Sequence, residues 1–347
     1  MALILGIEST CDETAASVVA DGFNVRSNII ATQVDLHAKY RGVVPEIASR
    51  AHIENILPVL GEAMTVAGFR ANDFSAIDAI AVAHRPGLIG SLLIGVTAAK
   101  SLAWALNKPL FGVDHVHAHL YSVVLETNEQ PKFPAVGLVC SGGHTALYRV
   151  GDWLDVELIG TTIDDAVGEA YDKVAAILGL GYPGGPVIDR LSRFGDSDAV
   201  HFPRTLLGRS SLDFSFSGLK TAVLYHVRGV PKKGQDIKAE PTELPDDEAL
   251  HDICASFQAA CIDVITEKLR RAARKIGAKS VILGGGVSAN TGLREALRSF
   301  PLPVHLPTMR YCTDNAAMSA GLAELYYRAG RFSDLGLDAV TYSQFAR

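Results

Sequence analysis

The first half of the chain alternates between short apolar runs and polar turns. LILGIES and AASVVA, separated by the turn-like TCDET, predict two antiparallel strands, and VRSNIIAT predicts a third. Apolar residues at helical spacing then predict a helix from Ile47 to Ala67. A buried strand at 79–83, a helix from Leu88 to Ala105, the strand LFGV and a helix from Asp114 complete the pattern.

The same order of elements starts again near residue 135. AVGLVCSGGHTALYRV predicts a strand, a glycine-rich turn and a second strand, which LDVELIGTT extends. Helical periodicity follows at 165–178 and 249–275, then the buried strand SVILGG and a helix starting near Asn290. Two halves that each open with a hairpin and continue into strand–helix alternation predict a duplicated α/β unit with mixed sheets.

Composition places the chain among folded proteins of about two domains. Its 347 residues are 48% hydrophobic and 20% charged, which excludes a disordered chain, a collagen-like chain and a small disulfide scaffold. The formal charge of -6 lacks the basic excess typical of nucleic-acid binders. A local basic patch stays open, and one candidate, equally explained as a solvated helix face, consists of Lys268, Arg270, Arg271, Arg274 and Lys275.

Several features predict a cytoplasmic protein without a membrane segment. The five cysteines are scattered and form no Cys-x-x-Cys pair, which is typical of a reducing compartment. The N-terminus lacks the basic region of a signal peptide. The apolar stretch from Leu88 to Leu106 is interrupted by Gly, Ser, Thr and Lys, so a buried helix explains it better than a membrane span. Residues 228–248, rich in Pro, Lys, Asp and Glu, predict an exposed insertion.

Two histidines and a distant aspartate form a candidate metal site. In DHVHAHLYS, His115 and His119 are four positions apart, so a helix places them on one face at chelating distance. Ordinary polar helix residues are the alternative. Asp314 in YCTDNAAM is the candidate third ligand, although Thr313 or Asp314 could instead cap the following helix. Two histidines and one carboxylate leave coordination positions open for substrate.

The same histidine spacing occurs in zinc proteases, but their motif requires a glutamate directly after the first histidine. Val116 occupies that position here. The general base of zinc-protease hydrolysis is therefore missing from the motif.

Two glycine-rich turns are candidates for nucleotide binding. GGGVSAN (284–290) follows a strand, and its glycines and the next helix start would let backbone N–H groups approach a ligand, with Asn290 bonding a base, ribose or phosphate. The alternative is a tight turn capped by Ser288 or Asn290. VCSGGHT (139–145) is either a second such loop or a plain hairpin turn. IESTCDET occupies the equivalent place in the first half, and two facing loops fit a nucleotide between lobes.

The segment EAYDKVAAILGLGYPGGP (169–186) places Asp172 in an amphipathic helix, where it could be a surface charge. The Gly-Tyr-Pro-Gly-Gly-Pro run predicts a rigid turn whose purpose composition does not explain.

Taken in order, these segments resemble the bacterial TsaD-type family of tRNA N6-adenosine threonylcarbamoyltransferases, formerly described as O-sialoglycoprotein endopeptidases. The resemblance runs through nearly the whole chain. The motifs that carry it are GIESTCDET, YRGVVPEIASRAH, PGLIGSLLIG, HVHAH, VCSGGHT, GEAYDKVAAILGLGYPGGP, DFSFSGLKTA, GGGVSAN and CTDNAAM.

The resemblance implies an α/β fold of the actin-like (ASKHA) ATPase type, with two duplicated lobes, mixed sheets and a nucleotide cleft between the lobes. We expect residues 1–130 to form the first lobe and residues 131–323, with the insertion at 228–248, to form the second. The helix and tail at about 324–347 should pack back on the first lobe.

The implied activity is transfer of a threonylcarbamoyl group from threonylcarbamoyl-AMP to N6 of adenosine 37, giving t6A in tRNAs that read codons beginning with A. One divalent metal per subunit, expected to be iron with zinc as the alternative, would be held by His115, His119 and Asp314. No catalytic residue beyond these ligands is assigned. The adenylate, or ATP or ADP in its place, would contact Val139, Cys140, Ser141, Gly142, Gly143, Asp172, Gly185, Asp189 and Asn290.

The implied partners are tRNA and the proteins TsaB and TsaE, with a homodimer as a further possibility. The chemistry fits this assignment, because N6 of adenine is a poor nucleophile and needs an activated carbonyl, which an adenylate and a metal provide. The base must also leave the tRNA stack, and the phosphates need cationic contacts. The alternative functions are a non-catalytic actin-like nucleotide-binding scaffold, which has no need of a metal triad, and a metalloendopeptidase.

Overall fold

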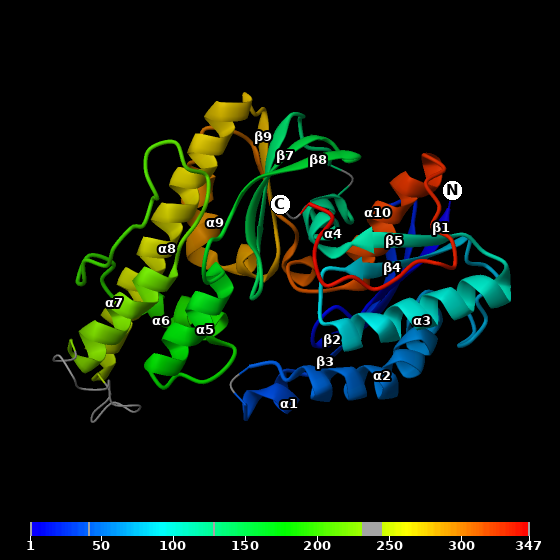
Figure 1. The fold of residues 1–347 in the computed structure, drawn as a ribbon, viewed down its shortest axis with the longest axis horizontal. Helices are drawn as coiled ribbons and strands as arrows, with labels where there is room; N and C mark the ends of the chain where they lie inside the picture. Colours follow the sequence, from blue (N-terminus) through cyan, green and yellow to red (C-terminus); the bar gives the residue numbers. More distant parts are fainter. Residues whose placement is uncertain (1, 41, 128, 231–244, 346–347) are drawn as a thin grey trace. The chain divides into compact units, whose positions relative to one another are not determined.

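The computed structural model describes residues 2–40, 42–127, 129–230 and 245–345. The chain divides into two compact units (Figure 1). The first unit consists of Met1–Pro131, Gly151–Val156 and Leu306–Arg347, and the second of Lys132–Val150 and Glu157–His305. The chain thus returns to the first unit at Leu306, earlier than the residue 324 expected from the sequence, so the loop that carries Asp314 belongs to the first unit.

The sheet of the first unit starts with the predicted hairpin and third strand. Strands β1, β2 and β3 are antiparallel, and β4 and β5 continue the sheet in parallel with β1. The strand order is β3-β2-β1-β4-β5. The strands are β1 (Leu3–Glu8), β2 (Glu13–Ala20), β3 (Asn24–Thr32), β4 (Ala79–Arg85) and β5 (Leu110–Asp114).

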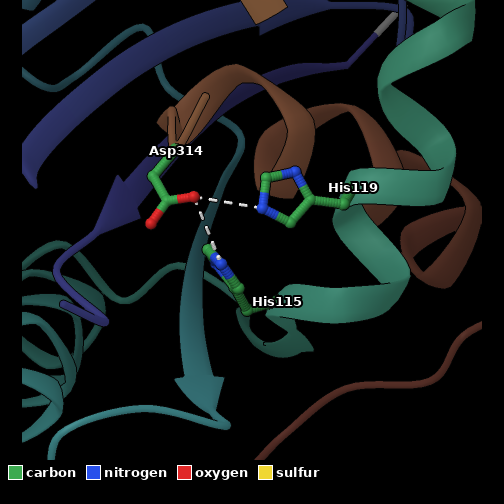
Figure 2. Close-up of side chains that lie close together, drawn as sticks. All are labelled: His115, His119 and Asp314. Carbon is green, nitrogen blue, oxygen red and sulfur yellow. Dashed lines mark hydrogen bonds and ion pairs between the residues drawn. The ribbon is translucent and has the colours of Figure 1, made fainter. Parts of the chain in front are cut away.

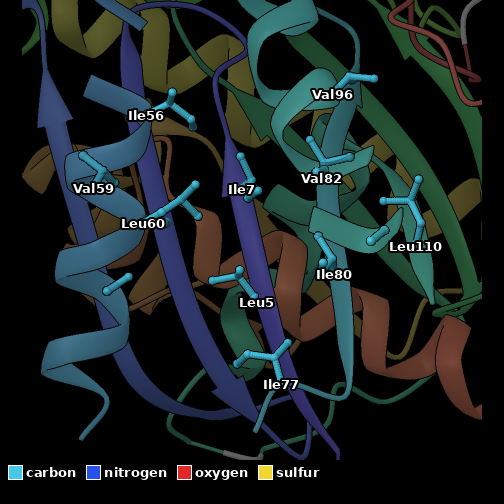
Figure 3. Packing of buried hydrophobic residues seen from close by; sticks show 14 of the residues in the cluster. Leu5, Ile7, Ile56, Val59, Leu60, Ile77, Ile80, Val82, Val96 and Leu110 are labelled. Carbon is cyan, nitrogen blue, oxygen red and sulfur yellow. The ribbon is translucent and has the colours of Figure 1, made fainter. Parts of the chain in front are cut away.

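Helices cover both faces of this sheet, which is why its inner strands are apolar on both sides. Leu5 and Ile7 of β1 pack with the apolar stripes of α2 and α3 (Figure 3). On the opposite face, Gly6 lets α10 approach, since a Cβ there would lie 2.3 Å from the carbonyl oxygen of Ala316. The helices of this unit are α1 (Val34–Ala38), α2 (Pro45–Val66), α3 (Ile89–Leu106), α4 (His115–Tyr121) and α10 (Ala316–Arg328), with short 3-10 turns at Ser122–Val124 and Met309–Tyr311.

The second unit repeats the topology of the first. Its strand order is β10-β9-β6-β7-β8, in which an antiparallel β6–β7 pair lies beside the parallel strands β9 and β10. The predicted duplication with mixed sheets is therefore confirmed. The strands are β6 (Ala135–Cys140), β7 (Thr145–Asp152), β8 (Asp155–Thr161), β9 (Ser280–Gly284) and β10 (Val304–His305).

The helices of the second unit include two that the sequence pattern did not reveal, α6 and α7. The predicted insertion at 228–248 runs from the last residue of α7 into the first turn of α8, and its residues 231–244 lie outside the described residues. The helices are α5 (Val167–Ile177), α6 (Gly184–Leu191), α7 (Ser217–Arg228), α8 (Asp247–Ile276) and α9 (Thr291–Arg298), with 3-10 turns at Ser192–Phe194 and Gly286–Ala289.

Helix α3 is the one helix among the described residues that is long and apolar enough to cross a membrane by length and composition. One of its faces, however, is buried in the core of the first unit through Leu92, Val96 and Ala99. This packing supports the interpretation of α3 as a core helix.

Candidate metal centre and nucleotide-binding loops

Three predicted metal ligands meet in the first unit. Helix α4 places His115 and His119 one turn apart, and Asp314 comes from the loop before α10 (Figure 2). Asp314 Oδ1 lies 3.1 Å from His119 Nε2 and 3.5 Å from His115 Nε2. One ligand atom from each residue lies within 4.8 Å of the other two. The structure therefore brings together side chains that are 195 positions apart in sequence.

Asp314 is not the cap of the following helix, which was the alternative explanation for it. Asn315 is the N-cap of α10, and its side chain accepts a hydrogen bond from Met318 N. The Asp314 carboxylate instead turns toward the two imidazole rings, whose centroids are 4.5 Å apart. The position of the Asp314 carboxylate is consistent with that of a metal ligand.

The charges around the cluster favour a cation. Burial alone would raise the pKa of Asp314, but the charge on His115 and hydrogen bonds from both histidines hold that pKa well below its usual range. Burial alone would lower the pKa of His115, and Glu8 and Asp314 outweigh it and raise that pKa well above normal. Burial and the neighbouring charge on His115 lower the pKa of His119, which favours the neutral imidazole that a metal requires.

Glu8, at the end of β1, is a site residue that sequence analysis missed. Its Oε2 lies 3.0 Å from His115 Nδ1, and Thr10 Oγ1 lies 3.3 Å from the same nitrogen. A carboxylate accepts, so Glu8 holds a proton on Nδ1 and leaves Nε2 as the ring nitrogen that faces Asp314. The signal was present in GIES, where an acid ends an otherwise apolar strand. His119 Nδ1 has no such partner among the described residues.

The predicted glycine loops of the second unit lie side by side. A Cβ on Gly285 would lie 2.4 Å from the carbonyl oxygen of Cys140, and one on Gly168 would lie 2.5 Å from that of Ser141. The end of β6, the start of α5 and the loop after β9 therefore touch. Val139 and Cys140 are fully buried in β6, so any ligand contact they make is through the backbone.

The turn at 141–144 is a hairpin turn with open space beside it. Ser141 N donates to the carbonyl oxygen of His144, as the simpler explanation of this motif predicted. A Cβ added to Gly142 or Gly143 would meet nothing within 4 Å. These glycines are therefore not required by packing, and the room beside them suits a ligand.

The Gly-Tyr-Pro-Gly-Gly-Pro turn joins α5 to α6. Asp172 Oδ1 accepts a hydrogen bond of 2.7 Å from Gly184 N. A Cβ on Gly184 would lie 2.5 Å from Ala175 Cβ, whereas one on Gly185 would meet nothing within 4 Å. Gly184 is thus required for close packing of the two helices, while Gly185 leaves open space.

Gln258 of α8, which sequence analysis also missed, connects two predicted adenylate contacts. Its Oε1 accepts from Asn290 Nδ2 at 2.6 Å, and its Nε2 lies 3.2 Å from Asp189 Oδ1. Asn290 also caps α9 by accepting from Leu293 N, so its capping interpretation is confirmed. Asp189 further accepts from the backbone and hydroxyl of Thr291. A buried glutamine within a long helix has no local sequence signal that would reveal this role.

The candidate basic stretch of α8 is not a continuous cationic surface. Lys268 is fully buried and donates to the carbonyl oxygens of Leu206 and Ser211, and burial lowers its pKa to about 8. Arg271 donates to Leu206 and Glu267. Both hold the 206–211 segment against α8, because buried amine and guanidinium groups need acceptors. The exposed members of the stretch are Arg270, Arg274 and Lys275.

Comparison with solved structures shows the fold. The chain is similar to HypF from T. kodakarensis, with a TM-score of 0.58 at 17% identity, over 94% of this chain and 48% of that one. It is also similar to component A of the Acidaminococcus fermentans (R)-2-hydroxyglutaryl-CoA dehydratase, with a TM-score of 0.52 at 14% identity, over 95% of this chain and 100% of that one. Together with the repeated strand order, these similarities show an actin-like (ASKHA) fold.

Comparison with family models and curated proteins shows which protein family the chain belongs to. The model of the family described as "TsaD: tRNA N6-adenosine threonylcarbamoyltransferase" matches residues 24–321. A protein of that enzyme name from Symbiobacterium thermophilum is 51% identical over 342 residues, which cover 97% of this chain and 95% of the relative. One from Moorella thermoacetica is 49% identical over 341 residues, with the same coverage. This chain therefore belongs to the TsaD family of tRNA N6-adenosine threonylcarbamoyltransferases.

Proposed function

We propose that this protein transfers the threonylcarbamoyl group of threonylcarbamoyl-AMP to N6 of adenosine 37 in tRNAs that read codons beginning with A. Family membership supports the reaction. The observation that carries the proposal in this chain is the convergence of His115, His119 and Asp314 on one point. Attack by N6 on the carbamoyl carbon would form the new C–N bond, break the bond to the phosphate oxygen of AMP and release AMP, while N6 loses one proton to solvent.

We propose that one divalent ion, iron or alternatively zinc, is held by His115 Nε2, His119 Nε2 and the Asp314 carboxylate. The donor set fits, since two imidazoles and one carboxylate suit either metal and leave positions for substrate. Such an ion would supply a Lewis acid that polarises or anchors the threonylcarbamoyl carbonyl. Glu8 orients His115 for this role through Nδ1.

We propose that the adenylate binds at the loops of the second unit. The open space beside Gly142, Gly143 and Gly185 supports this assignment, because none of the three is required by packing. Asp189 and Asn290 border these loops with orientations set by Gln258. The inter-lobe cleft and the contacts of Asp172 stay predictions of the family resemblance, as does occupation of the loops by ATP or ADP.

We propose that tRNA is the acceptor and that TsaB and TsaE homologues assist. Exposed Arg270, Arg274 and Lys275 support a role for α8 in phosphate contacts. The five cysteines are all free thiols, which supports action in the cytoplasm.

We propose that a TsaB-type partner binds exposed apolar side chains of helices α2 and α3. Leu57 is 71% and Trp104 is 74% exposed. If this face binds the partner, Leu57→Glu and Trp104→Glu should abolish co-purification, whereas Lys108→Glu should not. Retained co-purification in both apolar variants would place the partner elsewhere.

The reaction is tested by reconstitution. Purified protein, its TsaB and TsaE homologues, threonylcarbamoyl-AMP and unmodified tRNA should yield t6A, detected by mass spectrometry of nucleosides. Metal analysis of protein purified without added metal distinguishes the enzyme from a scaffold. A protein that contains the ion but forms no t6A under these conditions would contradict the proposed reaction.

A further inference from the structure

The helix that carries both histidine ligands begins at a buried carboxylate. Asp114 is the N-cap of α4, and its Oδ1 accepts hydrogen bonds of 3.0 Å from Val116 N and 3.3 Å from His117 N. Its Oδ2 accepts a 2.7 Å hydrogen bond from Ser343 Oγ and a 2.9 Å hydrogen bond from Gln344 N. The side chain of Asp114 is fully buried. One carboxylate oxygen of Asp114 therefore binds the helix, and the other binds the C-terminal end of the chain.

Residues 333–345, here called the C-terminal strap, reach Asp114 along the edge of the first sheet. Ser333 N donates to the carbonyl oxygen of Leu110 in β5, and Gly112 N donates to Ser333 Oγ. A Cβ on Gly112 would lie 2.5 Å from Leu337 Cδ1, so the strap crosses β5 where only glycine leaves room. β5 is the last strand in its sheet, and the strap covers that edge.

Further contacts fix the middle of the strap on β4 and α3. Val340 N donates to the carbonyl oxygen of His84, and His84 Nδ1 lies 2.9 Å from the carbonyl oxygen of Asp338. Lys100 Nζ donates to the carbonyl oxygen of Leu337 at 3.0 Å. The strap is therefore held by backbone and side-chain contacts before it reaches Asp114.

The end of the strap also contacts α4 and the neighbouring strand end. Arg85 Nη2 donates to Gln344 Oε1 at 3.0 Å, and the Phe345 ring lies edge-on to His117 with centroids 5.7 Å apart. Apart from the strap and the α4 amides, the charged neighbour of Asp114 Oδ2 is Arg85 Nε, at 3.9 Å. If the strap were removed, Asp114 Oδ2 would lose both of its hydrogen-bond donors in the strap and would keep only this distant partner and solvent.

We propose that Ser343 and Gln344 are positioning residues for the metal site, acting on His115 and His119 through Asp114. This inference rests on the proposed metal site. Helix α4 has seven residues, too few to be stable without its cap and its tertiary contacts. His119 Nδ1 has no partner among the described residues, so apart from its contacts with Asp314 and His115 the ring is positioned by α4 itself. The strap thus links the C-terminal end of the chain to the geometry of the metal ligands.

The test uses Co²⁺ as the probe, because its visible absorption bands report ligand geometry. We expect Ser343→Ala to weaken Co²⁺ binding by about threefold to tenfold and to change the spectrum, a smaller effect than that of groups that touch a ligand directly. A chain that ends at Tyr342 should bind Co²⁺ more weakly than Ser343→Ala does. Ser343→Thr keeps the hydroxyl and should retain affinity and spectrum, as should a chain that ends at Phe345.

Hydrogen exchange at the amides of Val116 and His117 gives a readout that needs no metal. Both amides should exchange faster in Ser343→Ala and in the chain ending at Tyr342, and at the normal rate in Ser343→Thr. Unchanged Co²⁺ affinity, spectrum and exchange in Ser343→Ala and in the truncated chain would overturn the inference. Failure of the unaltered protein to bind Co²⁺ is a different result, which would overturn the metal site and this inference with it.

Discussion

The two candidate sites are built in opposite ways. In the first unit, His115, His119 and Asp314 point their polar atoms at one another, and Asp314 has no capping role that would explain its place. In the second unit, Asp189 and Asn290 already have partners within the chain. What the second site leaves for a ligand is backbone and the space beside its glycines. The candidate metal site is thus recognised by polar side chains that converge on one point. The candidate nucleotide site is recognised by glycines that leave open space beside the backbone.

Removing a metal ligand should have the largest effect. Asp314→Ala should lose the bound metal and reduce t6A formation by at least about a hundredfold, because two imidazoles alone hold a divalent ion weakly. Metal analysis and the reconstituted reaction measure the two effects. The matched control is His117→Gln on the same helix, which should keep its metal. Full activity in Asp314→Ala would show that the cluster has no role in the reaction.

Glu8→Gln should weaken metal binding by about tenfold, since it removes the charge that holds the proton on His115 Nδ1. Competition with a chelator of known affinity measures this change. Adenylate binding by the second unit should stay the same, which separates the two sites. Loss of adenylate binding in this variant would mean that the sites are not independent.

Filling the open space beside Gly143 should weaken adenylate binding without changing the stability of the fold. Gly143→Val should raise the KM for threonylcarbamoyl-AMP by about fivefold or more, because the added methyl groups occupy the expected ligand volume. Since a Cβ there meets nothing within 4 Å, the free energy of unfolding should change by less than about 0.5 kcal/mol. The control is Gly218→Ala, whose Cβ would meet only Thr205 Oγ1, at 4.0 Å. An unchanged KM would remove this loop from the adenylate site.

The smallest effect is expected at Gln258. Gln258→Leu leaves Asn290 Nδ2 without its acceptor, which should lower the free energy of unfolding by about 1–2 kcal/mol. The affinity for the adenylate should fall about threefold because Asn290 and Asp189 lose a shared neighbour. Urea unfolding and a binding titration measure the two changes. A destabilised variant with unchanged affinity would restrict Gln258 to a structural role.

The sequence predicted most of the first sheet and the shared helix face of His115 and His119 because both depend on strong local patterns. Apolar runs gave β1 and β4, and the spacing of His115 and His119 gave one face of a helix. Asp314 was a candidate third ligand beside the alternative of a helix cap, and the family resemblance favoured the ligand, since no local pattern joins residues so far apart.

The features that sequence analysis missed are products of tertiary packing. Glu8 reaches His115 only because β1 ends beside α4, and Gln258 connects Asp189 and Asn290 only because α8 crosses behind both. The basic stretch of α8 was partly misjudged for the same reason, since a helical repeat does not reveal that Lys268 is buried beneath the 206–211 segment.

The most direct test of the account is anomalous diffraction at the iron and zinc edges from crystals of protein purified without added metal. The account predicts one peak per chain, about 2.0–2.2 Å from His115 Nε2, His119 Nε2 and an Asp314 oxygen. Crystals that hold an ion elsewhere, or that show no peak between these three side chains after soaking with Fe²⁺ or Zn²⁺, would contradict it.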